Sequence, residues 1–222
     1  MYIVAVIGQK GGGGKTTAAL ALAVAATEQG RRTAVIDADP QATASKWSDR
    51  REAEFPWVVS TVVARLRQAL HQAETNAVDL VFIDTPAKSG TDAVEIARVS
   101  DLVIVPIRPE IGDIETLPAV QDILKLAGDP LSMVLINAAP IQGSRHEDTA
   151  TAAREMGFEV CPVVLFNRVA HGDAKALGQT VVDYMPSSKG AEEAIQLYMY
   201  TSKLLEQHRT CHGKAESARA RT

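Results

Sequence analysis

The sequence predicts an α/β fold in which a doubly wound, mainly parallel sheet carries helices on both faces. Short apolar runs alternate along the chain with longer segments of helical periodicity, as expected when strands and helices alternate. Several of these runs are rich in valine and isoleucine and show no polar alternation, which is typical of strands buried on both faces. In such a sheet, ligands bind beyond the carboxyl ends of the strands. The residues that directly follow each apolar run are therefore the candidates for a functional site.

Six strands are expected, each from a short apolar run. They cover residues 2–7, 33–36, 80–83, 102–106, 133–136 and 160–166. Helical segments are expected at residues 16–28, 41–53, 61–74, 91–99, 114–126, 145–156 and 189–207. Glycines mark several of the helix boundaries, because glycine commonly starts or stops a helix; they are Gly30, Gly128, Gly157 and Gly190.

Length and composition favour one globular domain and a short tail. A chain of 222 residues with 46% hydrophobic and 23% charged residues is ordinary for a globular protein. We expect one domain over residues 1–207 and a basic, disordered tail over residues 208–222, where the apolar periodicity ends.

Composition also narrows the environment of the protein. No apolar segment approaches the roughly 20 residues of a membrane span, so no membrane partner is expected. Cys161 and Cys211 lie far apart in the sequence, which suggests neither a disulfide framework nor a paired-cysteine metal site. A cytoplasmic protein fits best. The net charge of −4 gives no overall attraction to nucleic acid, so any such binding requires a local patch.

The most informative motif lies between the first strand and the first helix, and reads Gln9-Lys10-Gly11-Gly12-Gly13-Gly14-Lys15-Thr16-Thr17. Glycines let successive backbone N–H groups converge on a phosphate, and the following helix adds the positive end of its dipole. In this pattern Lys15 reaches the outer phosphates and the Thr16 hydroxyl ligates Mg²⁺. A merely flexible glycine turn is the alternative. The strand before the motif and the helix after it favour a phosphate-binding loop, or P-loop.

Two further strands end in aspartate. Asp37 and Asp39 are two residues apart, so an extended backbone places both carboxylates on one face. Beside a triphosphate, such a pair can hold Mg²⁺ through water or orient an attacking water. The alternative is a helix N-cap at Asp39 with Pro40 as the first helical residue. Asp84 follows the third apolar run, where an aspartate supports Mg²⁺ in P-loop nucleotidases. An aspartate in that place can also form a turn with its own backbone.

Together these motifs resemble the deviant Walker A ATPases of the ParA/MinD type, a branch of the P-loop NTPases. The resemblance extends over roughly residues 1–207 and is greatest for the short plasmid partition ParA proteins. At the front of the loop, Gln9 stands where the general phosphate-loop pattern has glycine, and Lys10 adds a second lysine. The residues that carry the resemblance are Lys10 to Thr17, Asp37-Ala38-Asp39-Pro40-Gln41 and Asp84-Thr85-Pro86.

The resemblance implies a Mg²⁺-dependent ATPase that works as an ATP-dependent homodimer. Lys10 corresponds to the signature lysine, which reaches across the dimer to the phosphates of the partner; a cation from the second subunit there stabilises the charge of phosphoryl transfer. Lys15 holds the β- and γ-phosphates of its own subunit. Asp39 orients the attacking water, while Asp37 and Asp84 support the metal ion through water.

A base-recognition residue is also implied. Asn137 directly follows the fifth apolar run, which resembles the strand end where an asparagine recognises adenine in this family. Its amide offers the donor and acceptor that a base edge requires. An ordinary loop asparagine is the alternative. Phe166 is a second candidate for the base pocket, or a simple core residue.

Proteins of this type bind DNA non-specifically as ATP-bound dimers, and a ParB-like centromere-binding or adaptor protein stimulates their hydrolysis. The resemblance therefore implies a nucleoid-associated ATPase that segregates plasmid or chromosome DNA. Such binding requires lysines and arginines aimed at phosphates. Any one of these cations can instead be a solvated surface residue. The candidates are Arg168, Lys175, Lys189 and Lys203, joined in the tail by Arg209, Lys214, Arg219 and Arg221.

Other functions remain open at this point. A same-family ATPase that positions a protein organelle or a chemoreceptor cluster would carry the same motifs. A dethiobiotin-synthetase-like ligase shares the fold and the P-loop, but Lys10 favours a dimerisation switch over a substrate pocket. A MinD-like membrane helix is disfavoured because the segment after Gln207 has no apolar face. A nitrogenase-type iron protein lacks support because two distant cysteines do not form a convincing cluster set.

Overall fold

The computed structural model describes residues 1–87 and 90–219, with side chains described as far as Thr210. Its centre is a six-stranded sheet in which all strand pairs are parallel and the order is β3-β2-β4-β1-β5-β6. The predicted fold class is therefore confirmed. The strands are β1 (Tyr2–Val6), β2 (Thr33–Asp37), β3 (Trp57–Ser60), β4 (Leu80–Asp84), β5 (Leu102–Ile107) and β6 (Ser132–Ile136).

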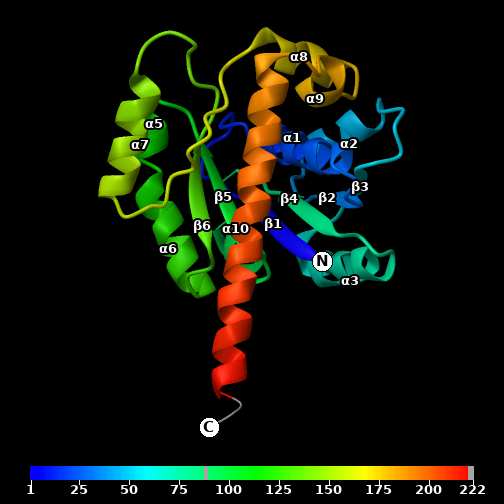
Figure 1. The fold of residues 1–222 in the computed structure, drawn as a ribbon, viewed down its shortest axis with the longest axis vertical. Helices are drawn as coiled ribbons and strands as arrows, with labels where there is room; N and C mark the ends of the chain where they lie inside the picture. Colours follow the sequence, from blue (N-terminus) through cyan, green and yellow to red (C-terminus); the bar gives the residue numbers. More distant parts are fainter. Residues whose placement is uncertain (88–89, 220–222) are drawn as a thin grey trace.

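Helices cover both faces of this sheet (Figure 1). One 3-10 turn, η1 (Val63–Arg65), precedes α3. The α-helices are α1 (Lys15–Glu28), α2 (Thr43–Ser48), α3 (Leu66–Thr75), α4 (Gly90–Arg98), α5 (Ile111–Ile114), α6 (Leu117–Ala127), α7 (Arg145–Glu155), α8 (Val169–Ala176), α9 (Val181–Tyr184) and α10 (Lys189–Arg219).

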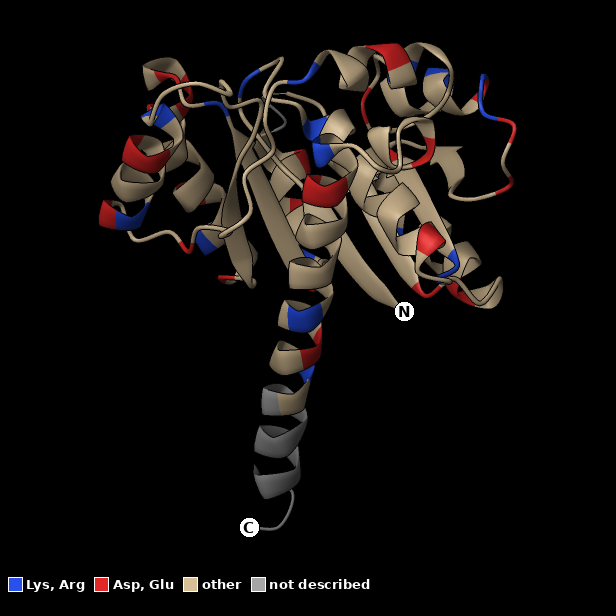
Figure 2. Cartoon of the chain, turned by 45° about the horizontal axis from the view of Figure 1, so that its top comes forward, with Lys and Arg blue, Asp and Glu red and all other residues tan. Residues whose placement is uncertain are grey.

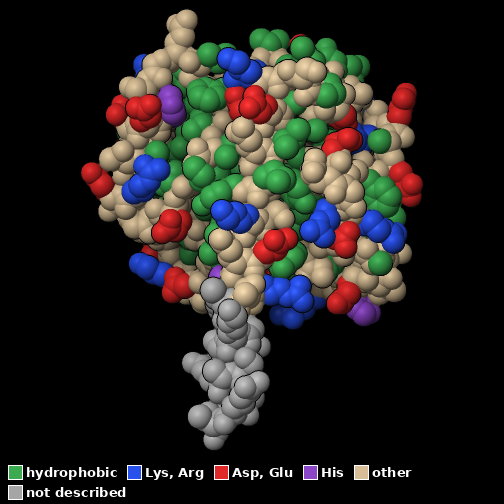
Figure 3. All heavy atoms as spheres, in the orientation of Figure 1, with side chains coloured by type: hydrophobic (Ala, Val, Ile, Leu, Met, Phe, Trp, Pro, Cys, Tyr) green, Lys and Arg blue, Asp and Glu red, His purple; other side chains and the backbone are tan. Residues whose placement is uncertain are grey.

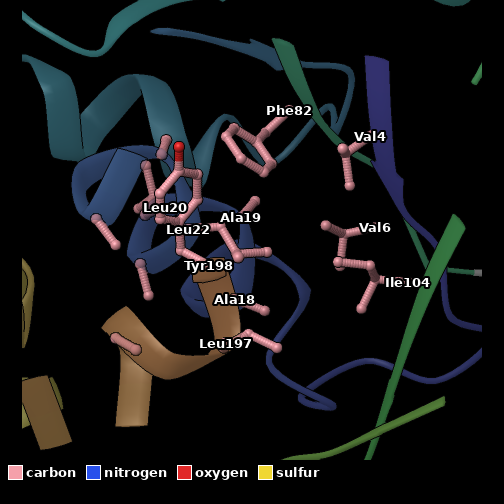
Figure 4. Packing of buried hydrophobic residues seen from close by; sticks show 14 of the residues in the cluster. Val4, Val6, Ala18, Ala19, Leu20, Leu22, Phe82, Ile104, Leu197 and Tyr198 are labelled. Carbon is pink, nitrogen blue, oxygen red and sulfur yellow. The ribbon is translucent and has the colours of Figure 1, made fainter. Parts of the chain in front are cut away.

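The two faces of the sheet have separate cores, because successive residues of a strand point to opposite faces. On β1, Val4 and Val6 pack against α1, α2, α9 and α10, whereas Ala5 packs against α3, α4, α6 and α7. Figure 4 shows the first core, where apolar residues of α1 meet Leu197 and Tyr198 of α10. Helix α1 is buried almost all round, and this fixes the glycine-rich loop that precedes it against the sheet.

One predicted strand was wrong and another was missed. Residues 160–166 form only two isolated bridges, Val134 with Val160 and Ala139 with Phe166. Pro162 lies within this segment and has no N–H to donate to a ladder. The sixth strand is instead β3, at the opposite edge of the sheet. Its four residues are half-buried or exposed, and its apolar run, Trp57-Val58-Val59, is only three residues long.

Several helices differ in extent from the prediction. The segment 41–53 contains only the six residues of α2, because Ala42 takes a left-handed conformation at φ 51°. The segment 114–126 is divided into α5 and α6, with Pro118 in the first turn of α6. Helices α8 and α9 were not predicted.

The C-terminal helix α10 is 31 residues long and extends past the body of the protein (Figure 1). It includes residues 208–219, which the sequence predicts as part of a disordered tail. No proline interrupts the chain after Pro186, and nothing else there forces the helix to end. The domain boundary at residue 207 stays a prediction. Among the described residues, no helix is long and apolar enough to cross a membrane.

Candidate functional site

A cavity of about 700 Å³ opens at the carboxyl end of the sheet. It lies beside β1, between β4 and β5, where the strand order reverses and α/β folds bind their ligands. Each of the five loops that follow β1, β2, β4, β5 and β6 contributes to its lining. One lining residue from each loop, in chain order, is Gly12, Asp39, Pro86, Arg108 and Asn137. The sheet thus gathers residues that are far apart in the sequence, in a space suited to a nucleotide.

The glycine-rich loop between β1 and α1 is held tightly by its neighbours. Gly12 and Gly14 have φ values of 80° and 86°, which favour glycine. A Cβ on Gly13 would lie 3.3 Å from the Pro106 carbonyl oxygen, and one on Gly14 would lie 2.0 Å from Asn137 Nδ2. Conformation or packing therefore favours glycine at Gly12, Gly13 and Gly14, whereas no atom lies within 4 Å of where a Cβ of Gly11 would be. The loop leads directly into α1, whose N-terminus attracts anions.

Lys15 is the cation inside this site. Its side chain is buried, and its Nζ donates to the Lys10 carbonyl oxygen at 3.3 Å. Burial lowers the pKa of Lys15, and the carboxylates of Asp84 and Asp39 oppose that shift. A bound phosphate would offer this ammonium a far stronger partner than a backbone carbonyl does. The arrangement agrees with the role predicted for Lys15.

Asp84 is a buried carboxyl group without a hydrogen-bond partner on either oxygen. Burial raises its pKa to about 7, while the nearby Thr16 hydroxyl and the Lys15 ammonium act in the opposite direction. A carboxylate orphaned beside a P-loop threonine fits a Mg²⁺ site. Among the described residues, no three His, Cys, Asp or Glu side chains cluster to hold a metal ion. Mg²⁺ would therefore be held by Thr16, Asp84, water and phosphate oxygens, and would neutralise phosphate charge.

The buried Asp84 predicts an unusual pH dependence for the nucleotide-free protein. The folded state keeps the proton of Asp84 up to about pH 7, whereas the ordinary value is 3.8. Because the folded state then binds more protons than the unfolded state, this group lowers the free energy of unfolding as pH rises from about 4 to about 7. Asp84→Asn should remove this loss, as measured by urea unfolding at pH 5 and pH 7 without nucleotide or Mg²⁺. Asp122→Asn, at an exposed position, is the control. If the free energy of unfolding changed equally between pH 5 and pH 7 in wild type and in Asp84→Asn, the assignment would be contradicted.

The two aspartates after β2 do different things. The buried Asp37 accepts hydrogen bonds from the backbone N–H and hydroxyl of Ser45, both at 2.8 Å, and so anchors the first turn of α2. Asp39 lines the cavity, and its Oδ1 accepts the Gln41 N–H at 2.9 Å. The alternative interpretation, an N-cap at Asp39 with Pro40 as the first helical residue, does not hold, because α2 begins only at Thr43 and its N-cap is Ala42. The water-orienting role of Asp39 and the metal role of Asp37 both stay predictions.

Lys10 lies outside the cavity lining, at its rim. Its side chain is 47% exposed, and its Nζ is 2.7 Å from Oδ1 of Asp113 and 3.9 Å from Glu110. The hydrogen bond and charge of Asp113 raise the pKa of Lys10. Asp113 is itself buried and accepts the Arg108 N–H at 2.9 Å. The second lysine of the loop therefore pairs with its own chain and does not point at its own phosphate site.

Two residues of the site were missed by sequence reasoning. The Arg108 guanidinium lies over the loop, with Nη2 3.4 Å from where a Cβ of Gly12 would be, and its Nε is buried without a partner. Arg108 directly follows β5, and that position was a usable signal. His171 of α8 also lines the cavity, and burial lowers its pKa. No pattern in the sequence places His171 there, because α8 reaches the site through tertiary packing.

Asn137 lies beside the P-loop. It is buried, lines the cavity, and donates from Nδ2 to the Gly13 carbonyl oxygen at 2.8 Å. Part of its hydrogen-bonding capacity is therefore used to hold the loop. Phe166 lines the same cavity. The predicted recognition of adenine by Asn137 is not tested by this geometry and stays a prediction.

The four cations predicted to bind DNA do not form one patch. Arg168 is paired with Glu193 at 2.5 Å, and Lys175 lines the nucleotide cavity. Lys189 and Lys203 are exposed on α10 but lie fourteen residues, or about 21 Å, apart along it. Helix α10 carries both signs of charge (Figure 2), and basic and acidic side chains are interspersed on the face drawn in Figure 3.

The tail candidates are only partly described. The Arg209 guanidinium lies over the ring of Tyr2, 5.7 Å from its centroid. Lys214, Arg219 and Arg221 lie outside the part of the chain whose side chains the structure describes.

The parallel sheet, the P-loop and the acidic residues around one cavity define a P-loop nucleotide-binding protein. Comparison with known proteins agrees. The family described as the CobQ/CobB/MinD/ParA nucleotide binding domain matches residues 4–196. The chain belongs to this family. The predicted resemblance to ParA/MinD-type ATPases is thereby confirmed, as are ATPase activity and the ligands ATP and Mg²⁺ at the level of the family.

Individual relatives cover nearly the whole chain. "Maintenance of carboxysome distribution protein A" of Gloeobacter kilaueensis is 28% identical over 207 residues, which are 92% of this chain and 94% of the relative. "Sporulation initiation inhibitor protein Soj" of Bacillus subtilis is 22% identical over 88% of this chain and 96% of its own. The septum site-determining protein MinD of Pyrococcus horikoshii, solved with Mg-ADP, has a TM-score of 0.73 at 21% identity, covering 93% and 98% of the two chains.

Proposed function

We propose that the chain is a ParA-like ATPase that cycles between a monomer and an ATP-bound sandwich dimer. The dimer binds nucleoid DNA non-specifically, and a ParB-like or adaptor protein stimulates hydrolysis and so releases it. One domain over residues 1–207 would carry the whole cycle. Lys15 and Thr16 hold the nucleotide phosphates and Mg²⁺, and Asp39 orients the attacking water.

The observation that carries this proposal is the placement of Lys10. The cavity already contains one buried lysine, Lys15, whereas Lys10 lies at the rim with half of its side chain in solvent. Its partners, Asp113 and Glu110, belong to the same chain. The pair with Glu110 is exposed and therefore weak. The buried Asp113 keeps the Arg108 N–H as a donor when the half-exposed ammonium of Lys10 moves to a stronger partner. The triphosphate of a facing subunit is such a partner, and a cation from outside stabilises the charge of phosphoryl transfer.

Dimerisation also supports the DNA-binding part of the proposal. A single subunit offers only separated cations, among them the exposed Lys189 and Lys203 on α10. Two subunits double this number, and each neutralised phosphate steepens the salt dependence of binding. The net charge of −4 gives no attraction without such a local array. DNA binding should therefore depend on the ATP-bound state.

Retention on DNA tests this function directly. The full chain is passed over immobilised non-specific duplex with ATP, with ADP or without nucleotide, at about 50 mM and about 200 mM salt. We expect retention with ATP alone, and about a thousandfold or greater loss of affinity at the higher salt for six or more phosphate contacts. Equal retention in all three nucleotide states would contradict the proposed switch. Hydrolysis that required a small acceptor molecule would indicate a ligase instead.

The cargo of the switch has two candidates. The sequence predicts segregation of plasmid or chromosome DNA. Distribution of a protein assembly is the second candidate, favoured by the 28% identity to a protein named for carboxysome distribution. Deletion of the gene in its host separates them. Loss of a low-copy replicon would support DNA cargo, and clustered protein assemblies with normal DNA inheritance would support the second candidate.

A further inference from the structure

One wall of the nucleotide cavity is aromatic. Among the described residues that line the cavity, Phe166 carries the only phenyl ring. The isolated bridge between Ala139 and Phe166 places it next to the strand end that carries Asn137 and Ala138. A purine base carries a flat apolar face that stacks on an aromatic ring. Phe166 is therefore the side chain best suited to pack against the base.

The Phe166 ring is held by two neighbours. The His146 ring on α7 meets it edge to face, with centroids 5.5 Å apart and an interplanar angle of 73°. The Arg168 guanidinium lies over it at 5.7 Å from the centroid. Aromatic and cation–π contacts of this kind fix the orientation of a ring. Phe166 is thus held in place by its protein neighbours.

Glu193, in the first turns of α10, joins these parts together. Its Oε2 accepts the backbone N–H of Phe166 at 3.1 Å, and its Oε1 accepts Arg168 Nε at 3.1 Å and Nη2 at 2.5 Å. The side chain is only 13% exposed. One carboxylate therefore fixes both the backbone that carries the ring and the guanidinium that covers it. Hydrogen bonds between two charged groups in this geometry are strong and directional.

A glycine in the first turn of α10 allows Arg168 to approach the helix closely. Gly190 lies one turn before Glu193 on the same helix face. A Cβ at Gly190 would lie 3.2 Å from Cδ of Arg168, closer than ordinary contact. Glycine there lets the arginine stem lie directly against the helix. Arg168 is thus built into a junction between the cavity wall and α10, which explains why it is not a free surface cation.

We propose that Glu193 is a positioning residue for the base of the bound nucleotide, acting through Phe166 and Arg168. It keeps the ring in the orientation that packs against the base, and it fixes the base end of the cavity to the start of α10. The inference rests on the proposed nucleotide site, and it assigns to this site a residue that contacts no part of the nucleotide itself.

Glu193→Gln tests the proposal, because glutamine keeps the shape but loses the charge and one acceptor. The full-length variant is titrated by calorimetry with each of two ligands, always in the presence of Mg²⁺. One ligand is ADP, and the other is inorganic tripolyphosphate, which has no base. We expect ADP to bind about tenfold more weakly than to wild type, with tripolyphosphate affinity changed by less than about twofold. Glu192→Gln is the matched control. Glu192 is the exposed neighbour on the same helix and accepts only a surface contact from Gln196, so both affinities should stay at wild-type values.

A second variant covers the case in which Glu193→Gln does not fold. Arg168→Lys keeps the positive charge but cannot donate from two nitrogens at once, and it should weaken ADP binding selectively, by a smaller factor. Equal weakening of ADP and tripolyphosphate, or no change in either, would overturn the positioning role. The proposed DNA switch is judged separately, since wild-type ADP affinity does not depend on retention on DNA.

Discussion

Lys10→Ala is expected to abolish ATP-dependent dimers while single subunits still bind nucleotide through Lys15. The Lys10 ammonium lies at the cavity rim, outside its own phosphate site, so its loss removes the cation offered to a partner. The buried Asp113 keeps the Arg108 N–H as a hydrogen-bond donor, and the fold should therefore survive. Partner-stimulated hydrolysis should fall by about a hundredfold or more, the usual effect of removing one charge-stabilising donor. Sedimentation with a slowly hydrolysed ATP analogue measures the dimer.

The matched control is Lys125→Ala, which removes an exposed lysine near the end of α6. It should leave dimerisation and hydrolysis at wild-type levels. A Lys10→Ala protein that still dimerises with ATP would show that the lysine acts only within its own chain. Loss of ADP binding in the same variant would also contradict the assignment, because it would place Lys10 among the phosphate ligands of its own subunit.

Gly14→Ala should produce the largest loss of stability of any single methyl group added to the site. The new Cβ would stand 2.0 Å from Asn137 Nδ2, at a φ of 86° that disfavours a side chain. Asn137 cannot retreat without breaking its hydrogen bond to the Gly13 carbonyl oxygen. We expect the free energy of unfolding to fall by about 3 kcal/mol from strain and overpacking. Nucleotide binding should fall with it, since Gly14 is the N-cap of α1, directly before Lys15.

Gly30→Ala separates backbone strain from the clash. Gly30 has a φ of 78° but no atom within 4 Å of where its Cβ would be. Its replacement should cost only about 1 kcal/mol. Urea unfolding of both variants measures the difference, and equal costs would mean that the contact between Gly14 and Asn137 is unimportant.

Much of the site could be predicted because its residues follow strands directly. The runs that became β1, β2 and β4 are strongly apolar, and the register pairs Asp37 with Asp84 across adjacent strands. A local pattern was thus enough to place these residues beside the P-loop. The motif around Lys10 was equally local. The family match confirms the family that this motif indicated, while the role of Lys10 itself stays a prediction.

The rest depends on contacts between distant parts of the chain. In the sequence, Arg168 looks like a surface cation. Only the structure places Glu193, 25 residues later, beside it. Lys175 also looks like a surface cation in the sequence, but α8 places it in the lining of the cavity. The edge strand β3 has only three apolar residues in a row, fewer than most of the runs from which the other strands were predicted. In each case the tertiary partner, absent from any local pattern, decides the outcome.

Helix α10 is long, and its first turns contact the wall of the nucleotide cavity. Thirty-one residues form a rod of about 46 Å, and its first turns hold the cavity wall through Glu193. A tilt of about 5° at that end displaces the far end by about 4 Å over this length. Helix α10 is packed into the core as far as Leu205, so a rearrangement around the nucleotide that tilted the helix together with this packed part would displace its outer end most.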